Sequence, residues 1–206
     1  MRRLTLAVLL LLLAIPPGYG EALDDAWAGI SWGEPAIAVL RSLGARATVL
    51  PQPLDFGDSY APLVVRDFRV GGVGLIVFYQ MDKTTQALKR IQLERPRHSV
   101  TPAAFQSVLE GIEGRYGPPD LLCGIRPGPS SGYQAAAERV WSRGGMVIRA
   151  IFRDTTLEAF NGCFITGSCG LTAQLLLRIS PPQLDNAACP PPIRPFPPGT
   201  PNPSRG

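Results

Sequence analysis

Two pairs of adjacent glycines constrain the fold more than any other feature of this 206-residue chain. Gly71-Gly72 and Gly144-Gly145 each stand between runs of β-prone residues. A phosphate-binding glycine loop needs a strand before the glycines and a helix after them, so that backbone N–H groups meet the anion. Here a strand pattern follows the glycines, which instead predicts a hairpin turn with positive φ angles. The glycine pairs therefore predict β-hairpins and argue against a nucleotide site.

Two stretches have the apolar spacing of an amphipathic helix. In the longer one, Thr101 is a candidate N-cap, Pro102 takes the favoured first position, and apolar residues follow at helical spacing until Gly117. A shorter stretch of the same kind runs from Pro35 to Gly44. Strand character, in most cases with apolar and polar residues alternating, is present in residues 74–79, 88–94, 146–154 and 173–180.

Several short features recur in the same order in the two halves of the chain. A Pro-Ala pair opens each predicted helix, a glycine pair follows, and an Arg-Ile pair closes each half at 90–91 and 178–179. We therefore expect an α+β fold of tandem helix-plus-antiparallel-meander (α-β-β-β) repeats, packed as one domain over residues 23–189. The two repeats would span about 23–96 and 97–189, and disulfides would stabilise them.

The two ends of the chain differ in character from this body. Arg2 and Arg3 precede an apolar run, Leu4 to Ile15, that is too short to cross a bilayer. We expect residues 1–22 to be a signal peptide for bacterial Sec export, with a periplasmic or secreted product; an uncleaved anchor is the alternative. Residues 190–206 are proline-rich, which predicts an extended, disordered tail.

Four cysteines lie in the part of the chain that would be exported: Cys123, Cys163, Cys169 and Cys189. An even number in an oxidising compartment favours two disulfides, and three pairings are possible. We favour a local Cys163–Cys169 bridge and a Cys123–Cys189 bridge that ties the start of the tail to the body. The spacing contains no Cys-x2-Cys knuckle, so a zinc site is disfavoured and no metal or cofactor is expected.

Composition and motifs offer little support for catalysis or nucleic-acid binding. The net charge is only +4, and no basic run stands out. His98, the single histidine, lies in a predicted loop without an evident orienting partner. Ser130 takes the nucleophile position of a Gly-x-Ser-x-Gly pattern, but a loop precedes it where that elbow needs a strand.

Aromatic side chains near arginines are the remaining candidates for a functional surface. Trp141 lies in a predicted strand beside Arg139 and Arg143, and Trp27 lies outside any strong pattern. Such residues are enriched in protein-binding hot spots, and core packing is the competing interpretation for Trp141.

Part of this pattern resembles a known family. A helix that closes on RYGPPD at 115–120, followed by RVWSRGGMVIRAIF at 139–152, resembles the small outer-membrane assembly lipoproteins of the SmpA/OmlA (BamE-like) type. The tandem arrangement resembles the β-lactamase-inhibitor-protein architecture. The resemblance covers residues 101–153 well and 31–94 loosely, and this chain lacks the lipobox cysteine. It implies helix-on-antiparallel-sheet units that act by binding other proteins.

These observations together predict a non-enzymatic, exported protein that binds another envelope protein through a sheet face or edge. The candidate contact residues are Trp27, Trp141, Arg139 and Arg143. Two alternatives stay open: a periplasmic hydrolase that uses Ser130 or His98, and a binder of a small apolar ligand held between sheet and helices.

Overall fold

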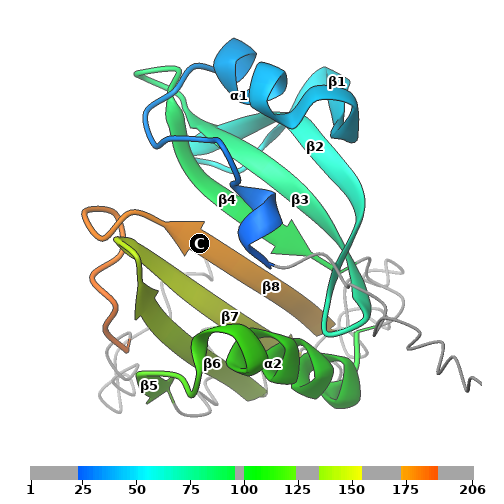
Figure 1. Ribbon diagram of the computed structural model, residues 1–206, viewed down its shortest axis with the longest axis vertical. Helices are drawn as coiled ribbons and strands as arrows, with labels where there is room; N and C mark the ends of the chain where they lie inside the picture. The colour runs from blue at the N-terminus through cyan, green and yellow to red at the C-terminus, as the bar shows by residue number, and fades with distance from the viewer. Residues whose placement is uncertain (1–22, 96–99, 124–134, 155–172, 190–206) are drawn as a thin grey trace, which may run out of the picture.

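The computed structural model describes residues 23–95, 100–123, 135–154 and 173–189 (Figure 1). Eight strands form one antiparallel sheet in the order β1-β2-β3-β4-β8-β7-β6-β5. The strands are β1 (Ala47–Asp55), β2 (Ser59–Val70), β3 (Val73–Asp82), β4 (Leu88–Glu94), β5 (Leu121–Cys123), β6 (Ala135–Arg143), β7 (Met146–Asp154) and β8 (Ala173–Ser180). The helices are α1 (Ala36–Leu43) and α2 (Pro102–Tyr116), with short 3-10 turns η1 (Leu23–Ala26) and η2 (Gly44–Arg46).

The expected tandem helix-plus-meander (α-β-β-β) repeats are wrong. The strands do not form two separate meanders, because β4 pairs with β8 through Ile91 and Ile179 and joins every strand into one sheet. Strand periodicity shows which residues face a core, but it does not show which strand pairs with which. Two isolated meanders would each leave an unpaired edge at this position, and the β4–β8 ladder satisfies those backbone groups.

Both glycine pairs form the predicted hairpin turns. Val70 pairs with Val73 around Gly71-Gly72, and Arg143 pairs with Met146 around Gly144-Gly145. All four glycines have φ angles between 56° and 76°, a region that glycine adopts without steric cost. The turn is therefore of the type whose twist matches that of the strands on either side.

The predicted helix α2 is present with the predicted ends. The Thr101 hydroxyl accepts a hydrogen bond from the Ala104 N–H at 3.1 Å, and Pro102 is the first helical residue. Gly117, with φ at 76°, ends the helix. Phe105, Val108, Leu109 and Ile112 form its buried face.

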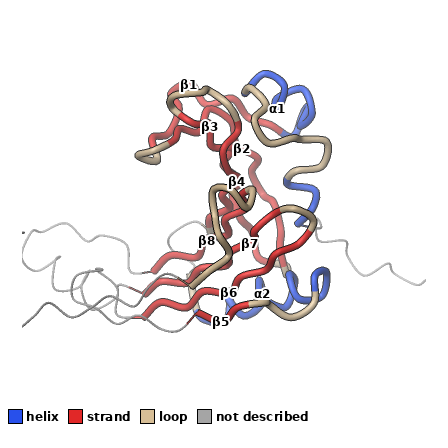
Figure 2. Tube along the Cα trace, turned by 90° about the vertical axis from the view of Figure 1, so that its left-hand side faces the viewer, coloured by secondary structure: helices blue, strands red, loops and turns tan. Residues whose placement is uncertain are grey.

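Both helices lie on the same side of the sheet, and the main core fills the space between them and the strands (Figure 2). Trp141, Tyr79 and Phe68 are among its largest fully buried side chains. The Tyr79 hydroxyl donates to the carbonyl of Ala26 at 2.8 Å and so ties η1 to the sheet. We call the opposite side, which no described helix covers, the helix-free face.

A disulfide joins Cys123, at the end of β5, to Cys189. Segment 181–189, which follows β8, thereby folds back over the helix-free face, where Ala187 packs beside Cys123, Val140 and Val147. Cys163 and Cys169 lie outside the described residues, as do the predicted signal peptide and the proline-rich tail. No helix within the described ranges is long and apolar enough to cross a membrane.

Candidate functional site

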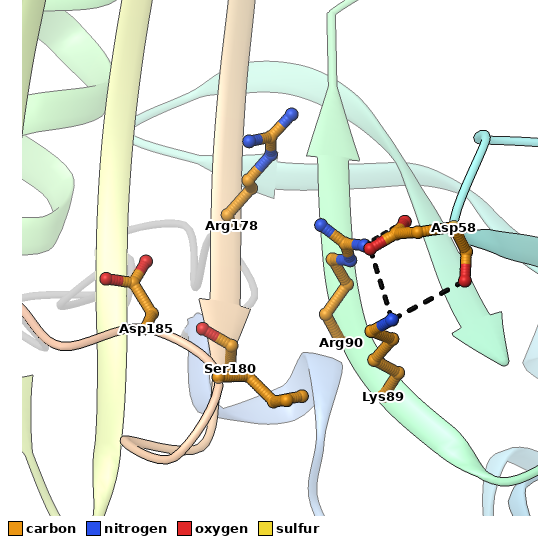
Figure 3. Close-up of a pocket in the computed structure, with 7 residues that line it drawn as sticks. Asp58, Lys89, Arg90, Arg178, Ser180 and Asp185 are labelled. Atoms are coloured by element: carbon orange, nitrogen blue, oxygen red, sulfur yellow. Dashed lines mark hydrogen bonds and ion pairs between the residues drawn. The ribbon is translucent and has the colours of Figure 1, made fainter. Parts of the chain in front are cut away.

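The helix-free face has a hollow where β4 and β8 lie side by side (Figure 3). Its volume is about 340 Å³, and five of its seven lining residues are charged: Asp58, Lys89, Arg90, Arg178, Ser180, Leu184 and Asp185. Asp58 comes from the turn between β1 and β2 on one side, and segment 181–189 supplies Leu184 and Asp185 on the other. Strands therefore make the floor of the hollow, and two connecting segments make its walls.

Strand alternation explains why polar residues form this floor. Ile91 on β4 and Ile179 on β8 are buried in the main core, so their neighbours along each strand point to the helix-free face. The register then places Gln92 beside Arg178, and Arg178 beside Arg149 of β7. A polar row consequently crosses the middle of the helix-free face.

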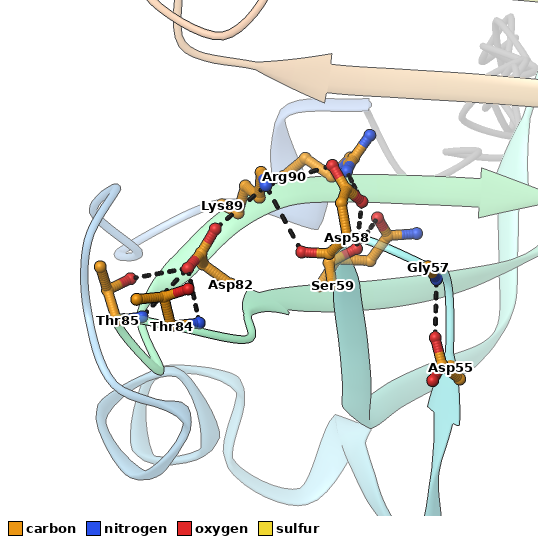
Figure 4. A network of polar contacts seen from close by, with 10 residues as sticks. Asp55, Gly57, Asp58, Ser59, Asp82, Thr84, Thr85, Lys89 and Arg90 are labelled. Carbon is orange, nitrogen blue, oxygen red and sulfur yellow. Dashed lines mark hydrogen bonds and ion pairs between the residues drawn. The ribbon is translucent and has the colours of Figure 1, made fainter.

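A network of ion pairs holds the Asp58 wall (Figure 4). The Asp58 carboxylate lies 3.1 Å from the Lys89 ammonium and also contacts the Arg90 guanidinium. Partial burial raises the pKa of Asp58, but the hydrogen bond from Lys89 and the charge of Arg90 outweigh it and hold that pKa below its usual value. Asp58 is therefore a fixed anion at neutral pH.

The same ammonium reaches a second carboxylate, Asp82, at 3.0 Å. Hydrogen bonds from the Thr85 N–H, from Lys89 and from the Thr84 N–H lower the pKa of Asp82 to about 2. The hydrogen bond with Asp82, followed by that with Asp58, raises the pKa of Lys89 above its usual value. Lys89 therefore stays charged and is fully engaged by two carboxylates.

The opposite wall depends on the buried Arg149. Its guanidinium bridges Glu138 at 2.8 Å and Asp185 at 2.6 Å, and it donates to the carbonyl of Ala188 at 3.2 Å. Burial raises the pKa of Asp185, but the hydrogen bonds and charge of Arg149 outweigh this effect and lower it overall. Arg149 thus anchors segment 181–189 to the sheet.

Arg178 differs from these cations. Its Nε donates to the Gln92 side-chain carbonyl at 2.9 Å, but within the described residues its terminal amino groups make no hydrogen bond and no ion pair. Burial, and then the positive charges of Arg153 and Arg90, lower the pKa of Arg178 below its usual value. The floor of the hollow therefore holds a partly desolvated guanidinium that forms no ion pair with any carboxylate of the described residues.

The structure does not gather the four predicted contact residues on one exposed surface. Trp141 is 0% exposed and its indole N–H donates to the Gly117 carbonyl at 2.9 Å, so it is a core residue. Arg143 binds the Asp120 carboxylate at 2.6 Å and the carbonyls of Tyr116 and Pro118, and so fastens the end of α2. These contacts give both residues a structural role.

The other two candidates lie on the helix side of the sheet. Arg139 is half-buried and donates to the carbonyl of Glu138. Trp27 is half-buried and lines a cavity of about 30 Å³ whose other residues are all apolar: Ile30, Trp32, Leu88, Ile91 and Met146. Neither residue contributes to the hollow.

The residues considered for catalysis, Ser130 and His98, lie outside the described ranges. Within those ranges no three His, Cys, Asp or Glu side chains come together in a way that could hold a metal ion.

Comparison with known proteins gives no match: no protein-family model, no curated protein and no solved structure is significantly similar to this chain. The resemblance to the SmpA/OmlA-type lipoproteins and to the β-lactamase-inhibitor-protein architecture accordingly stays a prediction.

Sequence reasoning missed the hollow, although part of its signal is visible in the chain. The alternation in 88–94 and 173–180 places Arg90, Gln92 and Arg178 on the faces of their strands that point away from the main core. The alternation does not show that β4 and β8 pair with each other, because these two strands are far apart in the sequence. Asp58 and Asp185 come from connecting segments that carry no periodic pattern at all.

Proposed function

We propose that the protein is an exported, non-enzymatic module of the periplasm that binds another envelope protein on its helix-free face. One observation carries this proposal. Both helices lie on one side of the sheet, and the other side is hollowed between the Asp58 turn and segment 181–189. Charged residues line this hollow, and Leu184, an exposed apolar side chain, lies beside them.

The face suits a partner better than the two edges of the sheet. At one edge, β1 contains Pro51 and Pro53, which have no N–H to donate to an added strand. They lie where the β1–β2 register is interrupted between Val49 and Leu54. At the other edge, β5 has only three residues. An added strand would find a short or interrupted ladder at either edge.

The ionisation of the hollow favours binding over catalysis. A general acid needs a carboxyl pKa raised toward the working pH, whereas the pKa values of Asp58 and Asp185 are lowered. Both carboxylates are also held in ion pairs. The hydrolase alternative depends on Ser130 and His98, and nothing in the hollow supports it.

No specific observation favours a small apolar ligand. The apolar cavity beside Trp27 has a volume of only about 30 Å³. A lipid or an apolar metabolite needs a pocket of several hundred Å³.

Site-specific photocrosslinking in living cells tests the proposal. A photoreactive amino acid at Leu184, on the helix-free face, is compared with the same amino acid at Ile37, an exposed position of α1 on the helix side. We expect one recurrent envelope protein to crosslink from Leu184 and not from Ile37. Crosslinks from Ile37 alone, or from neither position in folded and abundant protein, would overturn the proposal.

A further inference from the structure

We infer that Arg178 is the receptor for a carboxylate side chain that the partner protein inserts into the hollow. The inference rests on the proposed function, because it names the chemistry by which the partner is recognised. It is carried by the geometry of Arg178, by the charges around it and by the walls of the hollow.

The orientation of Arg178 suits a carboxylate. Its Nε is held by the Gln92 carbonyl at 2.9 Å, which positions the planar guanidinium before any partner arrives. Within the described residues the two terminal amino groups have no acceptor, so they are open to one from outside. A guanidinium presents its donors as a rigid fork that matches the two oxygens of a carboxylate.

The nearby acidic side chains are already committed to other donors. Glu138 and Asp185 accept from Arg149, and Asp58 accepts from Lys89 and Arg90. Glu94 accepts from the Gln92 amide. The described part of the chain therefore supplies Arg178 with no carboxylate, although burial makes an unpaired cation costly. A partner that brings a negative charge would relieve this cost.

The walls of the hollow select a single carboxylate over an extended polyanion. Asp58 and Asp185 stand on opposite sides of the hollow, so a nucleic acid or an anionic membrane surface laid across it would meet a carboxylate at each wall. One Asp or Glu side chain can reach the floor between them. Leu184, 53% exposed at the rim, offers an apolar contact to the residues beside that acid.

The photocrosslink from Leu184 gives a direct test in the full exported chain. Arg178→Gln removes the charge from the hollow, and the matched control Arg41→Gln removes one from the exposed part of α1 on the helix side. We expect Arg178→Gln to reduce the crosslink yield by about tenfold or more, because a buried charge pair loses one member. Arg41→Gln should leave the yield unchanged.

A second variant guards against misfolding of the first. Arg178→Lys keeps the charge but loses the planar fork, so we expect a yield between those of the wild type and Arg178→Gln. Urea denaturation of each purified variant shows that it is folded. In a folded variant, a wild-type yield for Arg178→Gln, or for Arg178→Lys if only that variant folds, would overturn the carboxylate receptor.

Exchanging the charges of Arg178 and of an acidic partner residue tests whether the two side chains pair with each other. Mass spectrometry of the crosslinked peptide identifies acidic residues of the partner, and each is changed to arginine in cells that carry Arg178→Glu. Recovery of the crosslink by one such exchange would support the inference, and failure of every exchange would overturn it. If the protein with native Arg178 gives no crosslink from position 184, the proposed function itself is overturned. The failure of the proposed function and the failure of the carboxylate receptor can therefore be told apart.

Discussion

The backbone of Gly71 lies directly against Gly111 of α2. A Cβ atom added to Gly111 would stand 2.5 Å from the Gly71 nitrogen, and one added to Gly71 would stand 1.8 Å from the Ser107 carbonyl oxygen. The tip of the β2–β3 hairpin thus docks on a helix that follows it in the chain (Figure 1). The hairpin backbone and α2 can approach this closely because both positions are glycine and carry no Cβ atom.

We expect Gly111→Ala to destabilise the protein, because its methyl group meets backbone atoms that cannot rotate away. Overpacking of this kind costs about 1–3 kcal/mol of the free energy of unfolding. Gly114→Ala is the matched control in the same helix, where a Cβ has nothing within 4 Å. There alanine should raise stability by up to about 1 kcal/mol, since it favours the helix. Urea denaturation measures both, and equal effects of the two substitutions would contradict the close approach.

The Cys123–Cys189 disulfide should contribute strongly to stability. It closes a loop with a sequence separation of 66 residues, and the chain-entropy estimate for such a loop is about 4 kcal/mol. We expect the Cys123→Ala/Cys189→Ala variant to lose stability of that order, with segment 181–189 becoming susceptible to proteolysis. Disulfide mapping of unreduced protein checks the pairing. A linked pair other than Cys123–Cys189 would contradict it.

Trp141 should act through the core and not through a partner. In Trp141→Phe the Gly117 carbonyl loses its donor and the smaller ring leaves a gap, and we expect a loss of about 2–4 kcal/mol. Trp27→Phe, at a half-buried position, should cost less than Trp141→Phe. A folded Trp141→Phe protein should also keep its photocrosslink from Leu184. A stable variant that loses the crosslink would assign Trp141 to the partner surface.

The pH dependence of stability should follow Asp82. Its folded pKa of about 2 lies below the value of 3.8 for an unperturbed group. The carboxylate therefore stabilises the fold above about pH 4, and this contribution is lost as the pH falls toward 2. We expect Asp82→Asn to be less stable than the wild type at pH 7, with the difference shrinking on acidification.

Asp67→Asn is the control for that experiment. Asp67 is exposed and makes no ion pair within the described ranges. Urea denaturation from pH 7 to pH 2 compares both variants with the wild type, and at pH 7 Asp67→Asn should cost less stability than Asp82→Asn. A difference between wild type and Asp82→Asn that stays constant over the whole range would contradict the role of Asp82.

Local chemistry explains which parts of the fold could be predicted. The hairpin turns at Gly71-Gly72 and Gly144-Gly145 need φ values that glycine adopts readily, and α2 is bounded by Thr101 and Gly117, which satisfy its own backbone ends. These requirements act between residues close in sequence. The tandem repeats were wrong because repeated local signals do not indicate whether two meanders stay apart or share a sheet.

The amino-acid sequence by itself determined the turns, the ends of α2 and the alternation that buries Ile91 and Ile179 and turns their neighbours outward. Only the tertiary structure decided that β4 lies beside β8, that Trp141 is buried, and that no carboxylate of the described residues pairs with Arg178. The physical reason is that backbone hydrogen bonding is the same for every strand, so the partner of a strand depends on how the whole sheet packs. A site that is built across the β4–β8 junction can therefore be recognised only once the pairing of these two strands is known.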